Sequence, residues 1–412
     1  MHPLTMRGRR VEVDGYRAVW NVGFVGEGLR ALPNKRVGME PHPYNVITTT
    51  SPTNTNLRKD LTMNKKALIA MSGGVDSSVA AYLMQKNGYT CEGATMRLYD
   101  KCPGDEEKNL SDINDAKSVC TALGINFHVL DYRDTFKKEV IDRFVSVYEN
   151  GGTPNPCIEC NKYMKFGMFL DAATELGCDK IATGHYARIT EEGGRFYLKK
   201  AVDEKKDQTY FLYSLDQSKL SRVEFPLGDM TKDEIRHLAT KQGFVSAHKS
   251  DSQDICFVPD GDYISVIKSV SGKNYPVGDF VDINGDKIGT HSGIINYTVG
   301  QRKGLGMAFG EKVYVKEKDI SLNRVVLAKN DNLFDYKLDA CDFNWIVYDT
   351  PPEKTVAWAK IRYAARPELC TVYVTDKDKV HIEFNSPQRA IAQGQAVVLY
   401  DGDTVLGGGT IV

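Results

Sequence analysis

A short run of glycine and hydroxyl residues, Ser72-Gly73-Gly74-Val75-Asp76-Ser77, has the composition and setting of a loop that holds a phosphate group. The apolar residues 67–71 before it predict a strand, and residues 78–86 after it predict a helix. Two adjacent glycines let the backbone curl, so that successive N–H groups point into one concavity. Because the loop ends at a helix N-terminus, the helix dipole also favours an anion there. The sequence therefore predicts a phosphate cradle.

No lysine follows the two glycines, which excludes the Walker-type phosphate loop. The spacing Ser-Gly-Gly-x-Asp-Ser instead resembles the pyrophosphate loop of ATP pyrophosphatases, enzymes that activate a carbonyl oxygen by adenylation. An ordinary glycine-rich turn between strand and helix is the alternative, because short motifs also occur by chance.

Cys157 and Cys160 form a second candidate for chemistry, in a stretch (151–161) whose two glycines and two prolines predict a rigid, irregular loop. We expect Cys160 to lie near the N-terminus of a helix that starts at Lys162, where a thiol pKa falls below its usual value of about 8.5. Lys162 and Lys165 would favour the thiolate in the same way. A zinc site or a redox pair is the alternative. A zinc site needs two more ligands, and the sequence has no second Cys-x-x-Cys pair.

The composition predicts a soluble, multidomain protein of the cytoplasm. The chain is 42% hydrophobic and 26% charged, and no apolar run approaches the roughly 20 residues of a membrane helix. Its nine cysteines are irregularly spaced, which is typical of reduced thiols rather than a disulfide framework. At 412 residues the chain exceeds one hydrophobic core, which stops growing near about 250–300 residues.

Alternating strand and helix patterns up to about residue 149 predict an α/β fold, a Rossmann-type parallel sheet with helices on both faces. Beyond about residue 268 the short alternating runs predict two smaller β-rich domains, the last a β-barrel. Such a barrel either presents loops to nucleic acid or only braces the first domain. The expected boundaries are 1–62 for a disordered or non-native extension, 63–267 for an ATP pyrophosphatase-type catalytic domain, 268–331 for a central β-rich domain and 332–412 for the barrel.

Six motifs occur in a fixed order: the loop at 72–77, TPNPCIECN at 153–161, TGHYAR at 183–188, KDQ at 206–208, DICF at 254–257 and YTVGQRKG at 297–304. Together they closely resemble the bacterial tRNA-specific 2-thiouridylases, from about Met63 to the C-terminus. The resemblance implies a monomeric, cytoplasmic sulfurtransferase that uses ATP to insert sulfur at C2 of the wobble uridine of tRNA. AMP and pyrophosphate are its other products.

For ATP, the resemblance implies contacts from Ala70, Met71, Ser72, Gly73, Gly74, Val75, Asp76, Ser77, Met96 and Gly184. Adenylation is needed because the C2 carbonyl oxygen is a poor leaving group, whereas AMP leaves readily. Asp76, through Mg²⁺, would hold the departing pyrophosphate.

For sulfur, the resemblance implies a persulfide on Cys256, loaded by a sulfur-donor protein, and a nucleophile at Cys160. Cys160 would free sulfide and leave a Cys160–Cys256 disulfide; in a variant, the persulfide attacks C2 and Cys160 resolves the adduct. Both routes need the two Cα atoms within about 7 Å of each other. Cys157 stands where some relatives have Asp, and an alternative is that Cys157, Cys160 and Cys256 hold a 4Fe–4S cluster.

For tRNA, the resemblance implies that Asn155, Pro156 and Cys157 contact the target base, which must leave its stack. It implies further tRNA contacts from Lys206, Asp207, Gln208, Arg362 and Tyr363. Residues 1–63 carry an excess of four positive charges, which leaves −5 on the remainder. RNA binding therefore depends on local basic clusters, for which solvated surface is the alternative.

Two other classes of protein share parts of this pattern. An adenylating amidotransferase or ligase has the same pyrophosphate loop but needs no paired thiols. A nucleic-acid-binding β module fused to an inactive nucleotide domain would bind RNA without releasing pyrophosphate.

Residues 1–62 hold five of the fifteen prolines and lack periodicity; a transit peptide is the alternative, weakened by Glu12, Asp14, Glu27 and Glu40. We expect a chain that begins at Met63 to remain soluble and fully active. Gel filtration and turnover measurements check this, and an aggregated or inactive product would place the boundary elsewhere.

Overall fold

The structure is a computed structural model of the 412-residue chain, and it describes residues 65–100, 106–247, 249 and 254–412. The extension expected at 1–62 lies outside the described residues. In the part of the chain that is described, no helix is both long and apolar enough to span a membrane.

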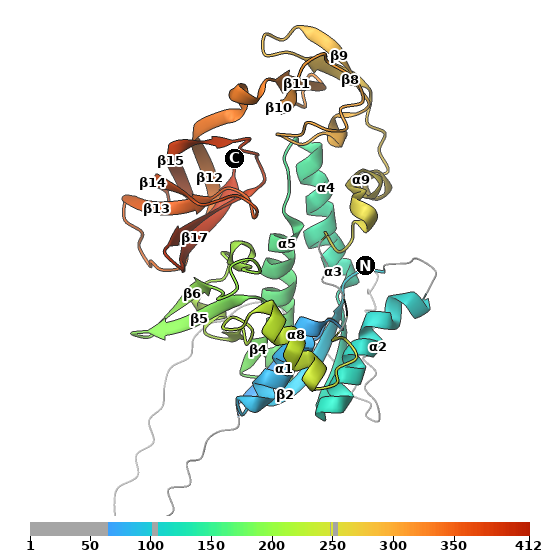
Figure 1. Ribbon diagram of the computed structural model, residues 1–412, viewed down its shortest axis with the longest axis vertical. Helices are drawn as coiled ribbons and strands as arrows, with labels where there is room; N and C mark the ends of the chain where they lie inside the picture. The colour runs from blue at the N-terminus through green and yellow to red at the C-terminus, as the bar shows by residue number, and fades with distance from the viewer. Residues whose placement is uncertain (1–64, 101–105, 248, 250–253) are drawn as a thin grey trace, which may run out of the picture. The chain divides into compact units, whose positions relative to one another are not determined.

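A five-stranded parallel sheet is the framework of the N-terminal region (Figure 1), with the strand order β3-β2-β1-β4-β7. Its strands are β1 (Lys66–Ala70), β2 (Thr90–Arg97), β3 (Asn126–Asp131), β4 (Lys180–Ala182) and β7 (Val223–Glu224). Strand β1 lies in the middle and pairs in parallel with β2 and β4. Such a strand is covered on both faces, which explains its continuous apolar run.

Helices cover both faces of this sheet, as the sequence predicts. Ala67 and Ile69 point to one side, where they pack with buried residues of α1 (Val75–Lys86), α2 (Glu106–Leu123) and α8 (Lys232–Lys241). Leu68 points to the other side and packs with Phe166 and Phe169. The alternation follows from the two-residue repeat of a strand.

Two composite helices complete this region: the first packs in a separate core, and the second packs on the second face of the sheet through Phe166 and Phe169. One consists of α3 (Arg133–Phe136), the π-helix η1 (Lys137–Ile141) and α4 (Asp142–Glu149). The other consists of α5 (Pro156–Glu159), the π-helix η2 (Cys160–Met168) and α6 (Phe169–Glu175). The shorter helices are α7 (Gln217–Leu220) and α9 (Tyr263–Ser271), with 3₁₀ turns η3 (Thr209–Phe211), η4 (Pro259–Gly261), η5 (Ile294–Asn296) and η6 (Asn330–Leu333).

The C-terminal region is all-β, as expected. A four-stranded sheet has the order β10-β11-β8-β9 and consists of β8 (Gly278–Val281), β9 (Lys287–His291), β10 (Tyr314–Asp319) and β11 (Arg324–Ala328). A six-stranded barrel follows: β12 (Phe334–Trp345), β13 (Lys354–Lys360), β14 (Glu368–Asp376), β15 (Lys379–Arg389), β16 (Ala396–Asp401) and β17 (Thr404–Ile411). It closes because β12 pairs with both β15 and β17.

A hairpin of the N-terminal region joins the barrel sheet. Strands β5 (Ala187–Glu192) and β6 (Arg195–Lys200) pair with each other, and β6 pairs with β17 through Lys199 and Thr404. The predicted fold class is confirmed, and the exact domain boundaries stay predictions.

Leu68 is fully buried in the central strand, so we expect Leu68→Ala to lower the free energy of unfolding by about 2–5 kcal/mol. Val129→Ala is the control, since Val129 is 41% exposed on the edge strand β3 and should change stability by less than about 0.5 kcal/mol. Urea denaturation measures both values, and equal losses would contradict this description of the core.

Candidate active site

The predicted ATP-binding residues gather at the carboxyl ends of β1, β2 and β4, where ligands of parallel sheets bind. The Thr95 hydroxyl donates to the Met71 carbonyl at 2.8 Å, which ties the end of β2, next to Met96, to the loop after β1. A Cβ atom on Gly184 would lie 3.0 Å from the backbone carbon of Asp76. The turn after β4 therefore packs directly on the start of α1, and glycine permits that approach.

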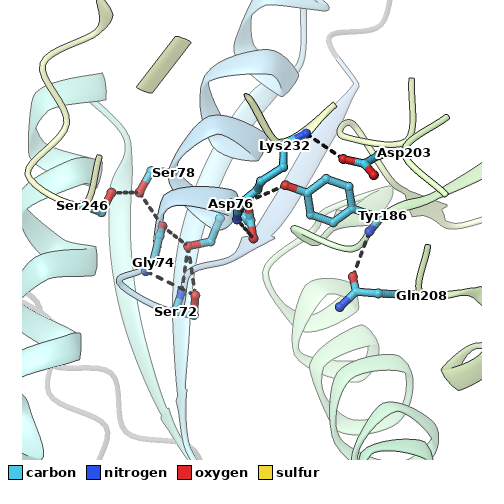
Figure 2. A network of polar contacts seen from close by, with 10 residues as sticks. Ser72, Gly74, Asp76, Ser78, Tyr186, Asp203, Gln208, Lys232 and Ser246 are labelled. Carbon is cyan, nitrogen blue, oxygen red and sulfur yellow. Dashed lines mark hydrogen bonds and ion pairs between the residues drawn. The ribbon is translucent and has the colours of Figure 1, made fainter. Parts of the chain in front are cut away.

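The loop at 72–77 is closed by its own serines (Figure 2). The Ser77 and Ser78 hydroxyls donate to the Gly74 carbonyl at 3.0 and 2.9 Å, and the Ser72 amide donates to the Ser77 hydroxyl at 3.2 Å. Gly73 has φ +71°, and a Cβ there would lie 2.5 Å from the Asp112 carbonyl oxygen. Gly74 precedes α1 without a side-chain cap, so the first-turn N–H groups are available to an anion. This geometry fits the polyphosphate of ATP.

Asp76 is the ionic centre of the loop. Its two carboxylate oxygens accept from Lys232 Nζ at 2.8 and 2.9 Å, and one also accepts from the Tyr186 hydroxyl at 2.8 Å (Figure 2). The Lys232 side chain is only 9% exposed. The sequence does not indicate the role of Lys232. The capping box of Thr231 and Glu234 predicts the start of α8, but no local pattern shows that the next residue, Lys232, pairs with Asp76.

Two further contacts hold the segment before Cys256 against the loop, and the sequence did not predict them. The Ser246 and Ser78 hydroxyls lie 2.9 Å apart. Lys249 Nζ donates to the Gly73 carbonyl at 3.3 Å and pairs with Asp112 and Asp115 of α2 at 3.1 and 2.6 Å. The phosphate loop thus faces a lysine on each side, Lys232 and Lys249.

Cys160 does not lie at a helix start, so that prediction is wrong. The helix begins at Pro156, a residue favoured in the first turn, and Cys160 is one turn inside it. Cys160 is buried, and burial raises the pKa of its thiol, against a smaller lowering by Lys165. Lys162 acts on the carboxyl group of Glu159 instead. The environment therefore holds Cys160 protonated more firmly than its sequence position suggested.

The three predicted cysteines come together at one site. Although Cys256 has exposed surface, desolvation by the protein atoms around its thiol raises the pKa to about 12, and repulsion from Cys160 and Cys157 contributes to the rise. Cys157 and Cys256 are exposed residues, whereas Cys160 is buried. The Tyr99 hydroxyl donates to the Cys256 carbonyl, which anchors this segment beside the end of β2. All eight described cysteines are free thiols.

An iron–sulfur cluster on Cys157, Cys160 and Cys256 stays a prediction. Within residues 65–100, 106–247, 249 and 254–412, no group of three or more His, Cys, Asp or Glu side chains is placed to hold a metal ion. Cys157, Cys160 and Cys256 are near one another without forming such a group, and we derive no step through a cluster.

The side chains of Asp207 and Gln208 are used inside the protein. The buried Asp207 carboxylate accepts from the Ala201 amide at 3.1 Å and from the Thr209 hydroxyl at 2.7 Å. The Gln208 side-chain oxygen accepts from the Tyr186 amide at 2.9 Å (Figure 2). Both residues thus support the turn after β4, and direct tRNA contact by them stays a prediction.

Arg362 and Tyr363 of the barrel lie beside this segment. The Tyr363 ring packs on Phe211 with centroids 4.6 Å apart. Burial and Asp207 raise the pKa of the Tyr363 phenol, and Lys206 lowers it by a smaller amount. Arg362 donates to the Arg389 carbonyl at 2.8 Å. The two predicted tRNA-contacting groups, far apart in sequence, therefore share one surface.

The segment predicted to contact the target base caps the α5 helix. Asn155 is its N-cap residue, without a side-chain hydrogen bond to the helix, and the buried Pro156 follows. Asn155 and Pro156 line a cavity of about 280 Å³, together with Glu159 and Tyr213. Cys157 points elsewhere, since it interacts with Cys160 and Lys165.

Removing Asp76 alone takes away the carboxylate that pairs with the largely buried Lys232, so we expect Asp76→Ala to cost about 3 kcal/mol of unfolding free energy. The double variant Asp76→Ala/Lys232→Met should recover most of this loss, because no buried charge remains. Urea denaturation of the single and double variants measures the coupling. Strictly additive losses would show that the ion pair contributes nothing.

Comparisons with known proteins agree with this architecture. Three family models match: "tRNA methyl transferase HUP domain" at residues 65–260, "tRNA methyl transferase PRC-barrel domain" at 265–329 and "Aminomethyltransferase beta-barrel domain" at 336–411. A solved structure of the U34-tRNA thiolase NcsA from Methanococcus maripaludis, with its 4Fe–4S cluster, is 20% identical, covers 51% of this chain and 71% of its own, and has a TM-score of 0.32. That likeness is too low to carry an argument.

Two curated relatives are far more similar. The tRNA-specific 2-thiouridylase MnmA of Clostridioides difficile (strain 630) is 48% identical over 355 residues, which cover 85% of this chain and 98% of the relative. The protein of the same name from Clostridium acetobutylicum is 48% identical over 354 residues, which cover 85% of this chain and 100% of the relative. Identity at this level over nearly the whole relative shows that the chain belongs to the tRNA-specific 2-thiouridylase family.

Proposed function

We propose that this protein is a tRNA 2-thiouridylase, which adenylates C2 of the wobble uridine with ATP and then replaces the adenylated oxygen with sulfur from a cysteine persulfide. The observation that carries the proposal is that one short turn touches both halves of the site. Gly184 packs on Asp76 of the phosphate loop, and the next residue, His185, contacts Lys165, which acts on the cysteines. Activation and sulfur transfer can thus occur on one base.

The first half of the reaction uses the loop and its lysines. The N–H groups at the start of α1 would bind the ATP phosphates, with Lys232 and Lys249 close enough to neutralise the pyrophosphate that leaves. Asp76 is the carboxylate that would hold Mg²⁺, whose charge would help to neutralise the departing pyrophosphate. In this structure both Asp76 oxygens accept from Lys232.

The second half uses two thiols. The thiolate of Cys160 attacks the inner sulfur of a persulfide on Cys256; a Cys160–Cys256 disulfide forms, and the outer sulfur leaves as hydrosulfide. Hydrosulfide then attacks C2, and AMP leaves. An external thiol reductant restores the two thiols. Cys256 is exposed, so a donor protein that carries a persulfide can reach it.

The tRNA would lie on the surface formed by Lys206, Arg362 and Tyr363. Aromatic rings next to cations bind nucleotides by stacking and phosphate pairing, and here Lys360 Nζ lies 5.4 Å from the Tyr363 ring centre. The target uridine would be turned out of its stack towards Asn155, Pro156 and Cys157. We further propose that the enzyme acts as a monomer in the cytoplasm.

Serine substitutions of the three cysteines should fail at different steps. With ³⁵S-labelled donor, Cys256→Ser should accept no label, while Cys160→Ser should accept label on Cys256 and stall before product. Cys157→Ser should keep appreciable activity, and Cys341→Ser in the barrel is the matched control. Mass spectrometry of tRNA nucleosides measures 2-thiouridine, and pyrophosphate release measures activation.

Each alternative has its own outcome in the same experiment. Joint loss of iron and activity in all three site variants would replace the persulfide route with a cluster. Full turnover by Cys160→Ser would exclude both, and would point to an adenylating ligase that needs no thiols. Binding of tRNA without any pyrophosphate release would indicate an inactive nucleotide domain.

A further inference from the structure

The sulfur chemistry has an electrostatic problem. Sulfur transfer proceeds through anions, either a thiolate or a hydrosulfide, because the protonated thiol is a poor nucleophile. Yet Cys160 is 8% exposed, and burial raises the thiol pKa of both Cys160 and Cys256. The site therefore needs a fixed positive charge, and the helix N-terminus expected from the sequence does not lie at Cys160.

The wide turn of the η2 helix places Lys165 on the side of Cys160. In an α-helix, a residue five positions further on points roughly 140° away around the axis. In a π-helix the hydrogen bonds span five residues, so positions five apart come close to the same face. Cys160 and Lys165 are five apart within η2 (Cys160–Met168). The π-helix therefore brings Lys165 to nearly the same helix face as Cys160.

His185 fixes the end of the Lys165 side chain. Lys165 Nζ lies 3.3 Å from His185 Nε2, and His185 Nδ1 lies 2.7 Å from the Thr183 hydroxyl oxygen. The imidazole is buried against the rings of Phe166 and Phe225, with centroids 5.7 and 5.9 Å away. Burial, with a smaller contribution from Lys165, holds the pKa of His185 well below 6.5, so the ring is neutral.

A neutral imidazole has one donor and one acceptor nitrogen. Since the ammonium group can only donate, Nε2 must be the acceptor, and Nδ1 carries the proton that it donates to Thr183. This chain of two hydrogen bonds determines both the tautomer of His185 and the position of the ammonium group.

We propose that Lys165 is the residue that stabilises the sulfur anions of this site, and that neutral His185 is a positioning residue that aims the ammonium group at them. The inference rests on the proposed function and names a further residue for the same reaction. Lys165 interacts favourably with the thiolates of Cys157, Cys160 and Cys256, and lowers the pKa of each thiol against the effect of burial. One cation therefore serves the persulfide-bearing and the attacking sulfur in turn.

The alternative role for Lys165 is a structural tether between η2 and the turn after β4. Lys165→Gln separates the two roles, because an amide can still donate to His185 but carries no charge. Lys165→Met removes both the donor and the charge, and Lys165→Arg keeps both. Lys162→Met is the matched control, since Lys162 lies on the same helix but contacts the Tyr163 ring, with Nζ 5.3 Å from its centre.

The direct readout is the rate at which iodoacetamide alkylates Cys160 and Cys256 between pH 6 and 10, followed for each cysteine by mass spectrometry. Lys165→Gln and Lys165→Met should react about tenfold more slowly at neutral pH, because a rise of about one unit in a thiol pKa lowers the thiolate fraction about tenfold. Lys165→Arg and Lys162→Met should keep the wild-type profile. Thermal unfolding confirms that each variant is folded.

The same variants should release pyrophosphate at near wild-type rates but form 2-thiouridine more slowly. Unchanged alkylation in Lys165→Gln, or slowing in Lys165→Met alone, would overturn the inference and leave a tether. That result is independent of the proposed function, which fails only if the wild-type protein makes no 2-thiouridine. His185→Leu should show an intermediate loss of alkylation rate, because the charge remains but is no longer aimed.

Discussion

The ion pair between Asp76 and the largely buried Lys232 determines the geometry of the nucleotide end of the site. A lysine that is 9% exposed needs partners for its charge, so α8 begins where its first residue meets Asp76. The same carboxylate accepts from Tyr186, in the turn after β4. One side chain therefore connects α1, α8 and β4, and the orientation of the phosphate loop follows from all three.

The barrel contributes to the sulfur end by supporting the loop before α5. The Gln395 side chain donates to the carbonyls of Thr153 and Pro154 at 2.9 and 3.2 Å, and the Thr153 amide donates to the Gln393 carbonyl at 2.7 Å. These bonds fix the entry to the helix that bears Cys157 and Cys160. The barrel is thus bonded to the loop before α5, so a force on the barrel is transmitted directly to the start of the helix that bears the two cysteines.

The sequence was sufficient where the signal is local. The strand, loop and helix around 72–77 and the all-β C-terminal region follow from short-range periodicity and glycine placement, and the structure confirms them. Met96 and Gly184 lie at the same sheet edge because of the strand order. Periodicity does not predict that order, and only the family resemblance assigned both residues to the ATP site. Lys232 and Lys249 were missed because their partners are far away in the chain, and no local pattern marks an ion pair between distant segments.

The error at Cys160 has a different origin. Helical periodicity predicts a helix start at Lys162, although Pro156 is the stronger signal for a first turn. A π-helix also alters the repeat on which such periodicity depends, so side chains five apart come to one face. The sequence therefore predicts that a helix dipole stabilises the Cys160 thiolate. In the structure, the positive charge that acts on Cys160 is Lys165, which contacts the neutral His185.

The topology explains why both chemistries meet at the turn after β4. The chain leaves β1 to build β2 and β3 on one side, then returns to build β4 and β7 on the other. The loops after β1 and β4 therefore flank the switch point of the strand order, where ligands of such sheets bind. Residues 183–186 follow β4 at that point, with Gly184 against Asp76 and His185 against Lys165. One short turn thus connects the phosphate loop with the lysine that acts on Cys160, which is the arrangement that adenylation and sulfur transfer on one base require.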